Sequence, residues 1–320
     1  MGKIKFAVLG AGHIANKFCR AVELVEGAEV VAVASQTEGK AKAFAENYRI
    51  AESYTSYEAM LKEATFDVVY IATTHNYHFE NVMLCLQHKK HILCEKPFVL
   101  TEKEARTAFE AAKEAGVFVM EAMWTRFLPA ILQAKAWIEA GKIGNIQMAH
   151  ALIGFKANED PKGRIFNPEL AGGAMYDIGV YAFEIMTYLI PETIQEIHTM
   201  TTKAQTGVDK VDNVAIRFET CLANLQTMVS GPCAPELRIH GSEGYIVIPN
   251  PIFARECTLH TGCGQAVQED TFTSDIENGF EYQIQEVVKC IQEGKLESSI
   301  VPHETTLQCA KLFDQCLGTN

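Results

Sequence analysis

The chain has 320 residues, enough for about two domains of ordinary size. Apolar residues make up 48% of the sequence and charged residues 21%, a composition that predicts a folded protein and excludes a disordered one. The net charge of −12, from 28 basic and 40 acidic side chains, makes nucleic acid and anionic membrane surfaces electrostatically poor partners.

Strands and helices alternate through the first third of the sequence. Short apolar runs predict buried strands, and apolar residues three and four positions apart predict helices. This alternation is typical of right-handed crossovers, so we expect a doubly wound parallel sheet covered on both faces. The predicted strands are Ile4–Leu9, Glu29–Ser35, Asp67–Thr73, His91–Cys94 and Val117–Glu121. The predicted helices are Ile14–Val25, Glu38–Tyr48, Tyr57–Ala64, Phe79–His88 and Glu102–Ala115.

The pattern changes after about residue 123. Consecutive strands with short turns fill Ile194–Thr273, which predicts an open, mostly antiparallel sheet in an α+β domain. We therefore divide the chain into a dinucleotide-binding domain, 1–123, and a substrate-binding and dimerisation domain, 124–320, whose last helix could pack back on the first. The other predicted elements are the helices Pro129–Ala140, Ala174–Ile190, Glu277–Glu293 and His303–Leu317, the strand Gln147–Gly154 and the loop Asn158–Gly173.

The N-terminus and the cysteines indicate a cytoplasmic protein. The first apolar run leads directly into a glycine turn and is too short to span a membrane, and no signal-peptide cleavage pattern follows it. None of the ten cysteines forms a C-x-x-C pair, and even the closest two, Cys257 and Cys263, lack a neighbouring histidine tract. We expect reduced cysteines that act as small core residues.

A glycine-rich turn follows the first predicted strand and opens the first predicted helix. Gly10, Gly12 and Ala15 form the G-x-G-x-x-A pattern, with His13 and Ile14 between them. In this pattern the first glycine makes a tight turn, the second lets the backbone approach a pyrophosphate, and the third small residue packs the helix against the strand. The helix N-terminus supplies N–H groups to the phosphates. The motif predicts dinucleotide binding.

The end of the second predicted strand indicates which dinucleotide binds. NAD enzymes usually carry an acidic residue there for the ribose hydroxyls, and a carboxylate would repel the 2′-phosphate of NADP. Here the residues are Ser35, Gln36 and Thr37, with Lys40 one turn later. We therefore expect NADP, although NAD or use of both remains open.

Polar residues also follow the next two predicted strands, at the sheet edge where ligands bind in such folds. Thr73, His75 and His78 follow one strand, where the histidines either contact the cofactor or simply begin a helix. No acidic third ligand is near them, so no metal site is expected. Glu95 and Lys96 follow the other strand. The Lys96 ammonium could stabilise negative charge on a substrate oxygen, but a surface Glu–Lys pair explains the same tripeptide.

A second candidate pair lies on the predicted helix Ala174–Ile190. Asp177 and Tyr181 are four residues apart and share a helix face, and Gly179 between them would leave room for a ring. An acid and a phenol in register could orient a substrate hydroxyl and move its proton. A buried structural pair is the alternative.

Together, AVLGAGHIA, DVVYIAT, EKP and GG-x-x-x-D-x-G-x-Y resemble the Gfo/Idh/MocA oxidoreductase family over nearly the whole chain. The resemblance implies a Rossmann domain, then a domain whose open sheet makes a homodimer or a higher homo-oligomer. It also implies that Lys96 and the pair Asp177 and Tyr181 meet over the nicotinamide. The Lys96–Pro97 bond is often cis in relatives, and Glu95 then approaches the cofactor.

Two departures from the usual family motifs point to a branch of that family. Tyr181 stands where His is common, and Thr73, Thr74 and His75 replace the frequent T-P-N. These changes, with the segment 121–127, look like the branch of dihydrodiol and D-xylose dehydrogenases, in which the tyrosine is the proposed acid/base. The resemblance implies a substrate pocket lined by three residues. For the two aromatic residues among them, packing at the domain junction is the alternative. The three residues are Trp124, Arg126 and Phe127.

The sequence therefore predicts an NAD(P)-dependent dehydrogenase acting on CH–OH groups. Its expected substrate is a secondary alcohol, lactol or ketone of a small sugar, polyol or diol. Two alternatives stay open: an imine or biliverdin-type reductase on the same fold, and a non-catalytic NAD(P)-binding regulator. Neither needs the alcohol-activating set Lys96, Asp177 and Tyr181, whose presence favours the dehydrogenase.

Overall fold

A computed structural model describes residues 2–262 and 267–318 of the chain, so Cys263 and part of the predicted strand region lie outside the described residues. The chain divides into two compact units. The first comprises Met1–Trp124 and Asn278–Ala310, and the second comprises Thr125–Glu277 and Lys311–Asn320. Neither described range contains a helix with the length and apolar character that crossing a membrane requires.

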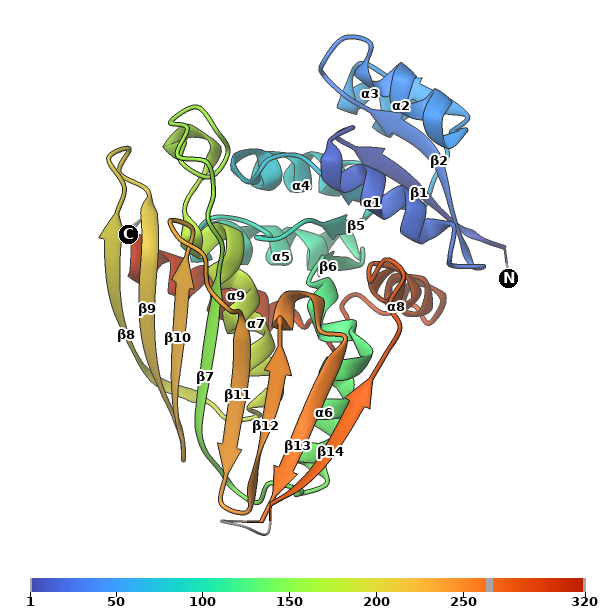
Figure 1. Ribbon diagram of the computed structural model, residues 1–320. Coiled ribbons are helices and arrows are strands. Elements are labelled where there is room, and N and C mark those ends of the chain that lie inside the picture. The colour runs from blue at the N-terminus through green and yellow to red at the C-terminus, as the bar shows by residue number, and fades with distance from the viewer. Residues whose placement is uncertain (1, 263–266, 319–320) are drawn as a thin grey trace. The chain divides into compact units, whose positions relative to one another are not determined.

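The first unit contains a six-stranded parallel sheet in the order β3-β2-β1-β4-β5-β6 (Figure 1). This is the strand order of a Rossmann fold, and it confirms the doubly wound sheet predicted from the sequence. Its strands are β1 (Ile4–Leu9), β2 (Ala28–Ala34), β3 (Glu52–Tyr54), β4 (Val68–Ile71), β5 (His91–Cys94) and β6 (Val119–Glu121).

Helices connect these strands, and their ends follow local capping rules. The Thr101 hydroxyl accepts a hydrogen bond from the Glu104 N–H at the start of α5, and Gly116 ends that helix in a left-handed conformation. The helices of this unit are α1 (His13–Val22), α2 (Lys40–Tyr48), α3 (Tyr57–Glu63), α4 (His78–Gln87), α5 (Glu102–Ala115) and α8 (Glu281–Gln292). Helix α9 (His303–Leu317) begins in this unit and ends in the second.

The second unit contains an eight-stranded sheet in the order β14-β13-β12-β11-β7-β10-β9-β8 (Figure 1). All its pairs are antiparallel except β7 with β10, which confirms the mostly antiparallel sheet. Its strands are β7 (Ile146–Gly154), β8 (Ile194–Lys203), β9 (Asp209–Phe218), β10 (Leu222–Met228), β11 (Glu236–Gly241), β12 (Gly244–Pro249), β13 (Glu256–Thr261) and β14 (Gln268–Thr273).

Alternate residues of the central strands are buried on one face of this sheet, as a half-covered antiparallel sheet requires. Two helices of the unit contact the sheet: α6 (Pro129–Glu139) contacts β13, and α7 (Val180–Leu189) contacts β7 and β10. The residues between the buried ones form the other face, which we call the outer face of the sheet.

The predicted helix Ala174–Ile190 is two segments: a π-helical turn, Met175–Gly179, and then α7. A side chain at Gly179 would meet the Met175 sulfur at 2.5 Å. The space beside Gly179 is therefore filled by Met175, which corrects the expectation that this glycine leaves room for a ring. Single π-helical turns are rare and often lie at functional sites.

The nine cysteines of the described residues all carry free thiols, and seven of them are buried. Burial raises the pKa of Cys19 to about 12 and the pKa of Cys94 well above its ordinary value. These thiols are protonated and unreactive at neutral pH, as expected for cysteines that fill a core.

Candidate active site

The glycine turn after β1 has a conformation that only glycine adopts easily. Gly10 has a φ of 104°, and its N–H donates to the carbonyl of Ala34 at 2.9 Å. A Cβ at this position would lie 2.9 Å from the carbonyl oxygen of Ala72. The turn is thus held between β2 and the end of β4.

The start of α1 is suited to an anionic ligand. Gly12 precedes the helix in an extended conformation, no side chain caps the first turn, and no acidic residue lies in it. The carbonyl of Gly12 accepts from the Asn16 amide at 2.9 Å, and the Tyr48 hydroxyl donates to Asn16 Oδ1 at 2.9 Å. Ala15 is fully buried. Because the first-turn N–H groups have no side-chain acceptor, these residues fit a pyrophosphate.

Gly10→Ala is expected to impair both folding and cofactor binding. The strained φ and the Ala72 contact should cost about 1–3 kcal/mol of unfolding free energy and move the turn. Thermal unfolding and a fluorescence titration with NADPH measure the two effects. Gly39→Ala is the matched control because Gly39 also has a positive φ, 72°, but nothing lies within 4 Å of its added Cβ. Equal losses in both variants would contradict a steric role for Ala72.

The first three residues after β2 present donors and no acid, and the carboxylate of Glu38 follows them. Ser35 is buried, and its Oγ accepts a hydrogen bond from the Thr37 N–H at 3.3 Å. Gln36, Thr37 and Lys40 are exposed. An amide, a hydroxyl and an ammonium are therefore available to a phosphate at this edge.

His78, the first residue of α4, is fully buried and lies between two backbone carbonyls. Its Nδ1 is 2.7 Å from the oxygen of Pro97, and its Nε2 is 3.1 Å from the oxygen of Thr73. Burial lowers the pKa of His78, so the ring is neutral and carries one N–H for these two acceptors. Both nitrogens face the protein, which favours a role in positioning the Lys96–Pro97 turn over the predicted cofactor contact.

Thr73 and His75, two other predicted cofactor contacts, follow the end of β4. The Thr73 hydroxyl accepts from the Asn81 amide at 3.1 Å. His75 begins a short 3-10 helix, His75–Tyr77, and its ring centroid lies 5.9 Å from that of His78. His75 stays a candidate for cofactor contact.

Lys96 follows β5, and its peptide bond to Pro97 is cis, as the family resemblance implies. The preceding Glu95 is buried, and its Oε1 accepts a hydrogen bond from the Tyr70 hydroxyl at 2.6 Å. Burial raises the pKa of Glu95, and the Tyr70 hydrogen bond and the charges of Lys96 and Lys17 oppose this shift. The buried carboxyl therefore lies in a positive environment.

Lys17 of α1 is a residue that the sequence reasoning missed. Its Nζ lies 3.9 Å from the ring centroid of Trp124 and 4.2 Å from that of Phe280. Burial lowers its pKa to about 8, and the charges of Glu95 and Glu281 oppose the shift. Its signal in the sequence is a lysine two residues after the end of the glycine motif. The Trp124 ring also packs on Phe280 at 5.2 Å, a contact within the first unit, and a place for Trp124 in the substrate pocket stays a prediction.

In the second unit, Asp177 lies in the π-helical turn and Tyr181 in the first turn of α7, and both are buried. Asp177 Oδ1 accepts from Arg164 at 2.8 Å. The sequence reasoning missed Arg164 because it lies in an irregular loop without periodicity. Lys96 belongs to the first unit, so each half of the predicted catalytic set is described within its own unit.

Arg126, predicted to bind substrate oxygens, has protein partners along α7. Its guanidinium forms an ion pair with Glu184 at 2.7 Å and donates to the Thr187 hydroxyl at 3.1 Å. Its side chain is 2% exposed and that of Glu184 is fully buried. These contacts favour a structural role in place of the predicted substrate contact. Phe127 is also buried.

Arg126→Met is expected to destabilise the protein by about 3–5 kcal/mol because it leaves the Glu184 carboxylate buried without its cation. Chemical denaturation of the variant measures the loss. Lys62→Met is the control, since Lys62 and its partner Glu58 on α3 are exposed, and its unfolding midpoint should stay close to that of the wild type. A stable Arg126→Met protein with a raised KM for substrate would restore the pocket role.

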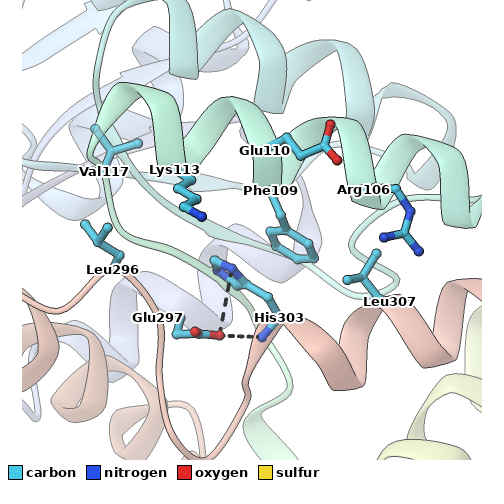
Figure 2. Close-up of a pocket in the computed structure, with 9 residues that line it drawn as sticks. All are labelled: Arg106, Phe109, Glu110, Lys113, Val117, Leu296, Glu297, His303 and Leu307. Carbon is cyan, nitrogen blue, oxygen red and sulfur yellow. Dashed lines mark hydrogen bonds and ion pairs between the residues drawn. The ribbon is translucent and has the colours of Figure 1, made fainter.

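A separate cavity of about 410 Å³ in the first unit contains none of the predicted site residues (Figure 2). The rings of Phe109 and His303 stack there with centroids 3.9 Å apart. The backbone N–H of His303 donates a hydrogen bond to Glu297 Oε2 at 2.8 Å. The cavity is lined by Arg106, Phe109, Glu110, Lys113, Val117, Leu296, Glu297, His303 and Leu307. It is distinct from the glycine turn and the strand ends described above.

Two family models match the chain. The oxidoreductase family model with the NAD-binding Rossmann fold matches residues 4–123, and the GFO/IDH/MocA C-terminal domain matches residues 131–247. Among curated proteins, the chain is 31% identical to the D-xylose 1-dehydrogenase (NADP(+)) of Hypocrea jecorina, over 98% of this chain and 91% of that protein. It is 30% identical to the trans-1,2-dihydrobenzene-1,2-diol dehydrogenase of Danio rerio, over 98% and 95%.

Solved structures share the fold over the whole chain. A levoglucosan dehydrogenase in complex with NADH and levoglucosan has a TM-score of 0.90 at 21% identity, covering 99% of this chain and 97% of that one. The aldose-aldose oxidoreductase of Caulobacter crescentus has a TM-score of 0.88 at 23% identity, with 98% and 96% covered. With the uncapped helix start, the glycine turn and the full-length relatives, these matches confirm the resemblance: the chain belongs to the Gfo/Idh/MocA family of NAD(P)-binding oxidoreductases.

Proposed function

We propose that this protein transfers a hydride between a nicotinamide cofactor and the carbinol carbon of a small sugar, polyol or diol. The observation that carries the proposal is the full-length likeness to dehydrogenases named for D-xylose and for a dihydrobenzenediol. Both substrates are hydroxylated rings, and the reacting group would be a secondary alcohol, a lactol or the corresponding ketone.

Residues of the first unit would hold the cofactor. Gly10, Gly12 and Ala15 fit the pyrophosphate, and the donors after β2 fit the ribose end. When bound, the nicotinamide supplies or accepts the hydride at C4.

NADP is the proposed preference because Ser35, Gln36 and Thr37 contain no carboxylate that would repel a 2′-phosphate. The named cofactor of the Hypocrea jecorina relative is also NADP(+). A levoglucosan dehydrogenase with the same fold is bound to NADH, so NAD stays the alternative.

The proposed catalytic set is Lys96, Tyr181 and Asp177. Lys96 would donate a hydrogen bond to the substrate oxygen and stabilise the negative charge that develops on it during hydride transfer. In the oxidising direction, the phenolate form of Tyr181 would take the hydroxyl proton, and in the reducing direction the phenol would return that proton. Asp177, held by Arg164, would orient the substrate or the phenol.

We also propose a homodimer, or a higher homo-oligomer, formed through the outer face of the eight-stranded sheet. Met148, Met200 and Leu222 are 49%, 68% and 59% exposed, and all three lie on this face. Apolar side chains of this size on an uncovered sheet face favour burial against a second copy. Sedimentation over a range of protein concentrations tests the proposal, and a monomer at all concentrations would end it.

A cytoplasmic location is the remaining proposal. The nine described free thiols support it, because disulfides would be expected in an oxidising compartment. Fractionation of cells that express a tagged chain tests this assignment.

The experiment that tests the function is a titration with NADPH and NADH, followed by a screen of polyols, aldoses and diols for cofactor reduction. Tight NADPH binding with oxidation of one of these classes is expected. Binding without turnover of any alcohol, but with reduction of an imine or a biliverdin-type substrate, would favour the reductase. Binding without any turnover would favour a regulator.

A further inference from the structure

Two carboxyl groups that the proposed mechanism does not use are buried next to the helical segment of the candidate site. Asp209 and Asp212 lie on β9 and are 2% and 1% exposed. No salt bridge to a basic side chain involves either of them in the described part of the chain. Two buried carboxyl groups without a cation are costly unless hydrogen bonds and shared protons compensate them.

Asp209 holds the start of the π-helical turn. Its Oδ2 accepts a hydrogen bond from the Met175 N–H at 2.5 Å, and a second one comes from the Ala174 N–H. Gly173 has a φ of 123°, and a Cβ there would overlap the Asp209 carboxylate. The first turn of the segment that carries Asp177 is therefore built around this carboxylate, which supplies the acceptor that its N–H groups need.

Asp212 is surrounded by donors and by Asp209. The Thr201 and Thr227 hydroxyls donate to its two oxygens at 2.9 and 3.0 Å, and the two carboxyl groups share a hydrogen bond. Burial and the charge of Asp209 raise the pKa of Asp212 to about 7, and burial also raises the pKa of Asp209. The Cys316 thiol of α9 also faces the pair, and its pKa of about 12 keeps it neutral.

We propose that Asp209 and Asp212 share one proton, and that the single charge, held on Asp209, positions the turn that carries Asp177 and leads into Tyr181. Asp209 is thus a positioning residue, acting on the candidate site through the backbone of Ala174 and Met175. Asp212 is its proton-bearing partner. The role in catalysis rests on the proposed function, whereas the shared proton does not.

The shared proton has a consequence for stability with a definite sign. The folded-state pKa of Asp212, about 7, is above the value of about 4 that an unfolded chain gives an aspartate. The native state therefore binds more protons than the unfolded state between these pH values, and the contribution of Asp212 to the free energy of unfolding falls as pH rises across that window. Above about pH 7, Asp212 loses its proton and becomes a second buried negative charge, which weakens the contact of Asp209 with the π-helical turn.

Thermal unfolding of wild type and Asp212→Asn between pH 5 and 8 tests the shared proton. The amide of the variant imitates the protonated carboxyl at every pH. The unfolding midpoint of Asp212→Asn, relative to that of the wild type, should therefore rise with pH. Asp270→Asn, on the exposed strand β14, should follow the wild type in parallel. If Asp212→Asn also follows the wild type in parallel, the shared proton is refuted.

Steady-state kinetics of Asp209→Asn test the positioning role. Its kcat should fall by about 10-fold or more while the dissociation constant for NADPH stays within about 3-fold of the wild type, because the glycine turn is untouched. The kcat of the wild type should also decline above pH 7 relative to that of Asp212→Asn. A wild-type kcat and pH profile in Asp209→Asn would overturn the positioning role. An inactive wild type would refute the proposed function instead, and the unfolding experiment would still decide the shared proton.

Discussion

Replacing Lys96 by methionine is expected to lower kcat by about 10²–10³-fold, the cost of losing one donor to a developing oxyanion. Methionine keeps most of the apolar stem and removes the ammonium. The dissociation constant for NADPH should change by no more than about 3-fold, because the pyrophosphate cradle of Gly10 and Gly12 lies on other strand ends. Stopped-flow or steady-state assays on the substrate found in the screen, with a parallel NADPH titration, measure both quantities.

The matched control is Lys113→Met on α5, which removes a lysine from the same unit at the cavity of Figure 2. Its kcat should equal that of the wild type. Turnover that persists in Lys96→Met would remove Lys96 from the mechanism. A large loss of NADPH affinity at unchanged kcat would instead make it a residue that binds the cofactor only.

Local patterns predicted the fold because each element of the first unit is encoded by its own segment. The predicted strands Ile4–Leu9 and His91–Cys94 and the helix Glu102–Ala115 have the observed bounds. The strand β3 was missed because Glu52–Tyr54 contains no apolar run and is defined by its pairing with β2. The π-helical turn escaped prediction because it depends on Asp209, 34 residues away from Met175.

The glycine motif was readable because its function lies in the backbone and in a few consecutive residues. Side-chain partners distant in sequence were not readable. Arg126 contacts Glu184, 58 residues away, and His78 contacts the carbonyl of Pro97, 19 residues away. A sequence pattern shows that an arginine or a histidine is present, but only the folded chain shows whether its polar atoms face a ligand or another part of the protein.

The same distinction explains why Asp177 and Tyr181 were found and Asp209 was not. The pair is marked by a local motif with three glycines, whereas Asp209 looks like an ordinary polar residue at the start of a strand. Its importance depends on burial and on the N–H groups of Ala174 and Met175. Residues that position a site are therefore harder to predict than those that form its motif.

Tyr181→Phe is expected to lower kcat by about 10²–10⁴-fold, the usual contribution of a positioned proton donor or acceptor. The substitution removes one oxygen atom from a buried ring in α7 and keeps its packing, so the unfolding midpoint should change little. The pH profile of kcat provides a second readout. The wild type should show the ionisation of the group that takes the proton, and the variant should lose that step.

Tyr176→Phe is the matched control, since Tyr176 lies in the preceding π-helical turn and its ring packs on Phe313 at 4.9 Å. It removes the same atom from the same segment, so a general disturbance of the segment would lower kcat in both variants. A loss confined to Tyr181→Phe, together with the altered pH profile, assigns the proton transfer to that phenol. Equal turnover in Tyr181→Phe and wild type would exclude Tyr181 as the group that exchanges the substrate hydroxyl proton, and hydride transfer from an alcohol would then need another acid/base.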